Sequence, residues 1–144
     1  MTETIEHKYS IAEFSALFDL KPSTLRFYEK EELIKPQRSA NGHRFYVDAD
    51  VQWMKFLEHL KGTGMSIIDL KKYVAWRSQG DQTIPERLEL LRATKQNFLK
   101  QLNEVQHHLQ ILNDKINWYE GKQAGMITED ESFAAYLAKM GHHE

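Results

Sequence analysis

Two stretches decide the fold: Thr24-Leu25-Arg26-Phe27-Tyr28-Glu29 and, a short distance along the chain, Asn41-Gly42-His43-Arg44-Phe45-Tyr46. The first predicts a short helix that carries Arg26 and Tyr28. The second predicts a tight hairpin, because an Asn-Gly pair suits a type I′ turn, which needs positive φ at both central residues. A short helix followed by a basic, aromatic hairpin can contact DNA at two places, the groove and the backbone.

Helix signals precede and include the first stretch. Ser10 and Glu13 fit a capping box at the start of a first helix. Pro22 suits the first position of the helix that holds Arg26, and we expect this second helix to end near Leu33. Two short helices joined by a turn at residues 18–21 make a helix-turn-helix.

Two further helices are expected after the hairpin. Asp48 looks like the N-cap of the third helix, and Gly62 with Gly64 should end it. Ser66 and Asp69 form a capping-box-like start for the fourth helix. The apolar side chains of the third helix recur at i, i+3, i+4 and i+7, as in an amphipathic helix: Trp53, Phe56, Leu57 and Leu60.

A heptad pattern follows from Ile84 to Tyr119 and holds for about five heptads. At ~1.5 Å per residue the helix would be about 54 Å long, and Gly121 and Gly125 should break it. Such a helix cannot bury its apolar stripe against itself, so it needs a partner. Lys95 is charged within the stripe; it either fixes the register or extends its side chain to water. The residues expected to carry dimerisation are Leu88, Leu91, Phe98, Leu102, Val105, Leu109, Leu112 and Ile116.

The end of the chain predicts one short helix, with Thr128 and Glu131 as its capping box. We therefore expect a mainly α chain in three parts. These are a winged helix-turn-helix DNA-binding domain at residues 1–82, a dimerisation coiled-coil helix at 83–120, and a short C-terminal effector or docking segment at 121–144.

Composition limits the function classes. The 144 residues carry a formal net charge of −2, so a basic total is missing, but residues 33–47 contain three basic residues and no acid. Nucleic-acid binding needs such a local patch. The chain has no cysteine, which excludes disulfides, thiolate metal sites and thiol redox switches. Met1-Thr2-Glu3-Thr4 begins polar and no segment is long and apolar enough for a membrane, so we expect a soluble, cytoplasmic protein with no membrane partner.

The predicted DNA contacts divide between the helix and the wing. Ser23 and Thr24 lie near a helix N-terminus, where exposed amides favour phosphate. Arg26 can bind a guanine edge or a phosphate, and Tyr28 offers a backbone contact. The alternatives are that Arg26 pairs with Glu29 or Glu32 and that the hairpin is merely solvated; Leu25 and Phe27 are expected in the core. The wing contacts are Arg38, Asn41, His43, Arg44 and Tyr46.

Residues 9–82 resemble the winged-helix DNA-binding domain of the MerR family of bacterial transcription regulators. The resemblance implies DNA contacts by Arg26, Tyr28 and Arg44, and a phosphate contact by Lys61. Phe27 and His43 stand where the family usually has tyrosine. The matching residues are Tyr9-Ser10-Ile11, Thr24 to Glu29, Arg38, Gly42, Arg44, Tyr46, Asp50 and Leu60-Lys61-Gly62-Thr63-Gly64-Met65-Ser66.

This resemblance also implies a mechanism. In the family the long helix pairs antiparallel with that of a second subunit, so a homodimer should bind a near-palindromic promoter operator. Family members bind between overlong-spaced −35 and −10 elements and distort the DNA so that RNA polymerase can engage. The alternative is an architectural coiled-coil protein that binds DNA without effector-driven activation.

The signal is less determined by the sequence. Residues 53–65 look like the aldehyde- and electrophile-responsive branch of the family, but His59 stands where that branch often has a reactive cysteine. His59 is otherwise a flanking residue on a core helix. A small-molecule effector is left open, while no cofactor and no metal site are expected. Aromatic residues could line a pocket or simply dock the last helix: Tyr73, Trp76, Trp118, Tyr119, Phe133 and Tyr136.

Isolated histidines make no catalytic site, so we expect no enzyme. Adjacent residues His107 and His108 fall at heptad positions f and g and should be solvated. The tail His142-His143-Glu144 is expected to be exposed and frayed.

Overall fold

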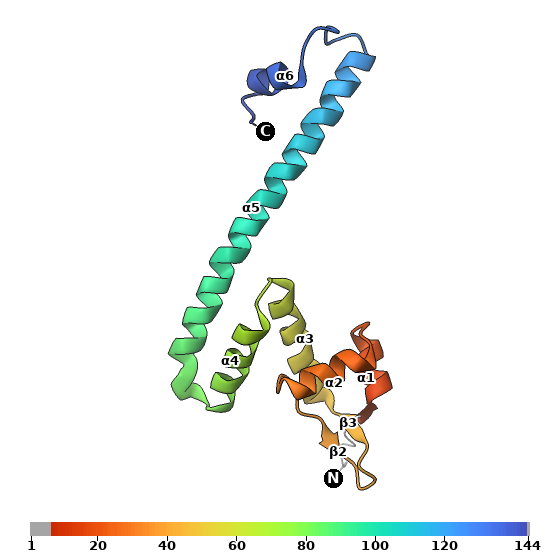
Figure 1. The fold of residues 1–144 in the computed structure, drawn as a ribbon, viewed down its shortest axis with the longest axis vertical. Coiled ribbons are helices and arrows are strands. Elements are labelled where there is room, and N and C mark those ends of the chain that lie inside the picture. The colour runs from red at the N-terminus through yellow and green to blue at the C-terminus, as the bar shows by residue number, and fades with distance from the viewer. Residues whose placement is uncertain (1–6, 144) are drawn as a thin grey trace, which may run out of the picture. The chain divides into compact units, whose positions relative to one another are not determined.

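The computed structural model describes residues 7–143 and confirms a mainly α chain. The expectation drawn from Met1–Thr4 and that for Glu144 lie outside the described residues. The chain divides after Lys95 into two compact units. In order, and as Figure 1 traces them, the elements are β1 (Tyr9–Ser10), α1 (Ile11–Leu17), α2 (Pro22–Lys30), β2 (Gln37–Arg38), β3 (Arg44–Tyr46), α3 (Asp48–Gly62), α4 (Ile67–Ser78), the 3₁₀ turn η1 (Asp81–Thr83), α5 (Ile84–Gln123) and α6 (Phe133–Met140).

The predicted starts of α1, α2 and α4 are confirmed. The Glu13 amide donates to Ser10 Oγ at 3.1 Å, and the Ser10 amide donates to Glu13 Oε1 at 3.0 Å, so the capping box is confirmed. The backbone hydrogen bond from Ser10 lowers the pKa of the Glu13 carboxyl. Pro22 begins α2, and Ser66 caps α4 by accepting from the Asp69 amide.

Two other predicted helix ends were wrong. Helix α2 ends at Lys30 and not near Leu33, because Glu32 adopts φ 61° and the Leu33 amide donates back to the Tyr28 carbonyl at 2.9 Å. Asp48 does not cap α3; its Oδ1 accepts from the Tyr9 hydroxyl at 2.9 Å. Instead the Asp50 carboxylate accepts from the Val47 amide at 2.9 Å.

The core of the first unit joins α1 to α4 and the sheet. The Phe14 ring stacks on the Tyr46 ring with centroids 4.1 Å apart, which ties α1 to β3. Each such buried apolar side chain stabilises the fold by about 1.5–3 kcal/mol. The core residues are Phe14, Leu25, Tyr28, Leu33, Ile34, Tyr46, Met54, Leu57, Leu60, Leu70 and Tyr73.

The wing is the hairpin of β2 and β3, which belongs to a small antiparallel sheet of strand order β1-β3-β2. Tyr9 pairs with Tyr46, and Arg38 pairs with Arg44. The hairpin is confirmed, but its turn is not type I′, because of the two central residues only Gly42 has positive φ, at 80°. The Ser39 amide donates to the His43 carbonyl, and the Gly42 amide donates to the Ser39 carbonyl, both at 2.9 Å, so residues 40–42 form a three-residue loop with glycine at its left-handed position.

Gly42→Ala should destabilise the domain by about 1–2 kcal/mol, because an alanine at this φ is strained while its Cβ would meet no atom within 4 Å. Gly62→Ala is the matched control: its Cβ is equally unobstructed but the residue is helical, so stability should rise by about 0.5–1 kcal/mol. Chemical denaturation measures both. Equal effects of the two substitutions would contradict the assigned turn.

Helix α5 carries the heptad pattern on 40 continuous residues. Seven of the eight predicted dimerisation side chains are exposed, from 41% at Leu88 to 62% at Leu112; Leu91 packs partly against the core of the first unit. Gly121 was expected to break the helix but lies within it. The amides of Met126 and Ile127 donate to its carbonyl, and an added Cβ would lie 2.5 Å from Ile127 Cδ1, so its lack of a side chain makes room for the following loop.

The end of the chain folds back within the second unit. Ser132 caps α6 by accepting from the Ala135 amide at 3.1 Å, so the predicted box at Thr128 and Glu131 was wrong. The predicted frayed tail was also wrong at His142, whose Nδ1 lies 2.7 Å from an oxygen of the buried Asp114 carboxylate. This contact holds the end of the chain against α5.

Candidate nucleic-acid interface

The exposed face of α2 carries Arg26 and Phe27. Leu25 and Tyr28, three residues apart, share the buried face and are 0% and 2% exposed. Phe27 was expected in the core, but it is 46% exposed because the helix turns it away from Leu25. A basic and an apolar side chain therefore stand side by side on the exposed face.

Arg26 is not held by the acids of its own helix. Among residues 7–143 no ion pair involves Arg26, and Glu29 pairs with arginines of the wing. The alternative in which Glu29 or Glu32 neutralises Arg26 is therefore absent from the structure. Arg26 is exposed, and within the described part of the chain no hydrogen bond occupies its guanidinium donors, which can bind a guanine edge or a phosphate.

The Tyr28 hydroxyl, which the sequence predicts as a contact to the DNA backbone, touches a side chain of α3. Its ring is buried, its hydroxyl contacts Lys61 Nζ, and the ammonium also lies 4.6 Å from the ring centroid. Glu58 Oε1 is 3.6 Å from the same ammonium. Burial lowers the pKa of Lys61 and raises the pKa of Glu58, because each charged form is partly removed from water. Lys61 thus joins α3 to the back of α2.

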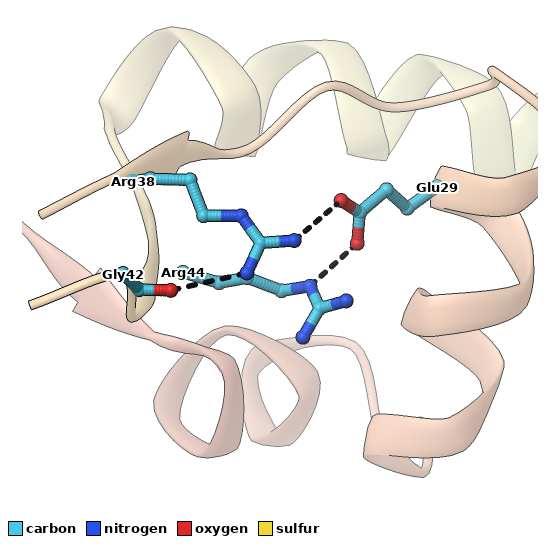
Figure 2. A network of polar contacts seen from close by, with 4 residues as sticks. All are labelled: Glu29, Arg38, Gly42 and Arg44. Carbon is cyan, nitrogen blue, oxygen red and sulfur yellow. Dashed lines mark hydrogen bonds and ion pairs between the residues drawn. The ribbon is translucent and has the colours of Figure 1, made fainter.

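The wing is fastened to α2 by Glu29, as Figure 2 shows. Glu29 Oε1 accepts from Arg38 Nη2 at 3.2 Å, and Glu29 Oε2 accepts from Arg44 Nε at 2.5 Å. Arg38 Nη1 also donates to the Gly42 carbonyl at 3.1 Å. One carboxylate therefore connects α2, the helix that carries Arg26 and is called the recognition helix below, with both wing strands and, through Arg38, with the wing turn.

The remaining predicted contacts fall into two groups. Ser23, Asn41 and His43 are exposed, and Thr24 is half-buried in the first turn of α2. Tyr46 is 1% exposed and stacked on Phe14, so the structure places it in the core and not on a contact surface. Burial raises the pKa of its hydroxyl.

The effector candidates are distributed over both units. His59 is exposed on α3, while Tyr73 is a core residue of the first unit, 8% exposed and stacked on Trp53. In the second unit the Trp118 and Phe133 ring centroids are 5.6 Å apart. Lys115 Nζ lies 4.5 Å and 4.2 Å from those centroids. These contacts support the alternative in which the C-terminal aromatics dock the last helix.

No helix within residues 7–143 is long and apolar enough to cross a membrane. In the same part of the chain, no three side chains of His, Asp or Glu are grouped so that they could hold a metal ion.

The chain is similar to known proteins. Residues 9–75 match the MerR HTH family regulatory protein family. A relative from Haemophilus influenzae, described as an uncharacterized HTH-type transcriptional regulator, is 36% identical over 117 residues, which is 81% of this chain and 87% of the relative. The chain belongs to the MerR family. The residues that match the family model contain the helix-turn-helix and the wing.

Other MerR-family proteins are also similar to this chain. The HTH-type transcriptional regulator AdhR of Bacillus subtilis is 33% identical over 63% of this chain and 66% of its own length. The structure of HiNmlR, a MerR family regulator lacking the sensor domain, bound to promoter DNA, has a TM-score of 0.74 and 35% identity and covers 82% of this chain and 94% of that one. This chain is accordingly a MerR-family transcriptional regulator with a DNA-binding helix-turn-helix.

Sequence reasoning missed the role of Glu29. It was considered only as a partner of Arg26, three residues earlier on the same helix. A signal was present, because residues 33–47 contain Arg38 and Arg44 and no acid that could pair with them locally.

Proposed function

We propose that this MerR-family regulator binds, as a homodimer, a near-palindromic promoter operator and controls transcription by distorting an overlong promoter spacer. The observation that carries the proposal is the combination, on one chain, of an exposed Arg26 beside a basic wing and an uncovered apolar stripe along α5. The HiNmlR regulator bound to promoter DNA supports the DNA-binding part.

The exposed stripe supports the dimer. Exposed apolar side chains recur at heptad spacing along α5. In an isolated helix these side chains stay in water and do not stabilise the fold, because stabilisation requires their burial. Pairing two copies of the stripe would bury these side chains and place two DNA-binding domains at a fixed separation. A two-fold dimer then requires an operator with two-fold symmetry.

The chain would then work in three parts. Residues 1–82 contact DNA through Arg26, Arg44 and the amides near Ser23. Residues 83–120 form the dimer, and residues 121–144 dock against the long helix or receive a small-molecule effector. A regulator of this kind acts at the promoter beside RNA polymerase, so we place it in the cytoplasm with the chromosome. We propose no catalytic activity for it.

Spacer distortion has a simple physical basis. Each surplus base pair shifts one promoter element by ~3.4 Å and rotates it by ~34° relative to the other. Bending and untwisting restore the alignment that polymerase needs, at a cost of about 1–6 kcal/mol for the bend. The free energy released when a two-fold dimer binds its operator is large enough to offset the free energy needed to bend the DNA.

Transcription from the mapped operator tests this function. With purified RNA polymerase, the protein should activate the promoter with its native spacer, and should not activate a version shortened by about two base pairs, which polymerase can use unaided. Binding without an effect on transcription from either promoter would instead favour the architectural alternative.

A further inference from the structure

The two oxygens of the Glu29 carboxylate bind two different wing arginines. Arg38 comes from β2 and Arg44 from β3, so a single side chain of α2 connects both strands of the hairpin (Figure 2). The Glu29 side chain is 25% exposed, as is appropriate for a group at the edge of the helix–wing junction.

The two arginines are used differently. Arg38 donates through one Nη to Glu29 of α2 and through the other to the Gly42 carbonyl of the wing turn, so both Nη nitrogens have partners within the domain. Arg44 donates to Glu29 through Nε (Figure 2), and within residues 7–143 no hydrogen bond or ion pair occupies its two Nη nitrogens. These two nitrogens are the pair with which a guanidinium can grip a phosphate in bidentate fashion.

We propose that Glu29 is a specificity-determining positioning residue. It fixes the wing against the recognition helix, with Arg38 as an internal brace and Arg44 as the DNA contact, so that Arg44 and Arg26 meet the operator at one set separation. This inference rests on the proposed operator binding and adds to it the residue that makes the two contact points act together.

Glu29 should affect specific and non-specific binding in opposite directions. Its negative charge opposes the attraction of DNA for Arg38 and Arg44, and this attraction dominates non-specific binding. By fixing the wing relative to the helix, Glu29 strengthens binding only at a DNA site that both elements must contact together. At such a site a preordered contact surface loses less conformational freedom on binding. Removing the charge should therefore loosen discrimination without reducing adhesion to DNA.

Stability alone does not explain the arrangement. Surface ion pairs contribute about 0–1 kcal/mol each to folding, and every partner in these two pairs keeps at least 25% of its side chain exposed. The chain also offers a matched comparison in Glu31, two residues further on, whose side chain is likewise 25% exposed and whose Oε2 lies 3.2 Å from Lys71 Nζ on α4. Glu31 has the same charge and exposure as Glu29 but holds α4 and not the wing.

The test compares full-length wild type, Glu29→Gln and Glu31→Gln on an operator selected by the wild type from random-sequence DNA and on DNA of unrelated sequence. Fluorescence anisotropy at several salt concentrations gives both affinities. Glu29→Gln should lower the ratio of operator to non-specific affinity about tenfold, with non-specific binding no weaker, because one charge-assisted hydrogen bond of the pair is lost. Glu31→Gln should keep the ratio within about twofold, although it makes the same change in net charge.

A second pair of variants separates the brace from the contact. Arg44→Gln should reduce the slope of log affinity against log salt by about one per subunit, whereas Arg38→Gln should lower the ratio with a smaller change in slope. Circular dichroism confirms that each variant is folded. A wild-type ratio in Glu29→Gln, or an equal loss in Glu31→Gln, overturns the inference while leaving operator binding intact. A wild type without operator preference refutes the proposed function itself, and this inference with it.

Discussion

Replacing Leu102 and Leu109 with glutamate is expected to make the protein monomeric and to weaken operator binding by at least ~10²-fold. Both side chains lie in the apolar stripe of α5, at 44% and 56% exposure. In a dimer each substitution would bury a carboxylate beside apolar side chains of both subunits, which is costly unless the charge is paired. The affinity falls because two linked DNA-binding domains gain from an effective local concentration that separate monomers lack.

Analytical ultracentrifugation and anisotropy on the selected operator measure the two effects. The matched control is Gln96→Glu with Asn103→Glu, which adds the same two charges to exposed positions of α5 outside the stripe. This control should stay dimeric and lose less than about tenfold in affinity, a loss due to added repulsion from DNA. A doubly substituted stripe that remains dimeric would show that the subunits meet elsewhere.

The sequence predicted best what depends on short-range contacts. The capping box at Ser10 and Glu13, Pro22 at the start of α2 and the heptad spacing all involve residues within a few positions of each other. Their hydrogen bonds or periodicity are set by the local backbone, so the residues near each site determine the outcome.

The prediction failed where contacts between residues far apart in the sequence determine the structure. Helical spacing places Tyr28 beside Leu25 on the buried face, but the partner of its hydroxyl, Lys61, lies thirty-three residues further along the chain. Glu29 pairs with arginines nine and fifteen residues away in preference to Arg26. The last helix begins after Ser132, and the end of the chain is held by the Asp114–His142 contact, which joins residues twenty-eight apart. A single sequence shows such partners only as unassigned charges and aromatic rings.

Arg26→Ala is expected to reduce operator affinity by ~10²-fold or more. Arg26 is exposed at the recognition helix, and no ion pair within the described residues occupies its guanidinium. A bidentate contact to a base contributes about 1–3 kcal/mol of discrimination, and a dimer would make the contact twice. The control Lys100→Ala removes the same charge from an exposed position of α5 and should change the affinity by less than about threefold.

Arg26→Lys then distinguishes a base contact from a phosphate contact. Lysine keeps the positive charge but lacks the planar fork of donors that matches a guanine edge. If Arg26 contacts a base, Arg26→Lys should retain the salt dependence of the wild type and lose most of its preference for operator over unrelated DNA. If Arg26 contacts a phosphate, the preference should largely survive in the lysine variant, since a point charge still binds phosphate. Undiminished operator binding by Arg26→Ala would remove this residue from the interface altogether and leave the wing as the principal reader of the operator.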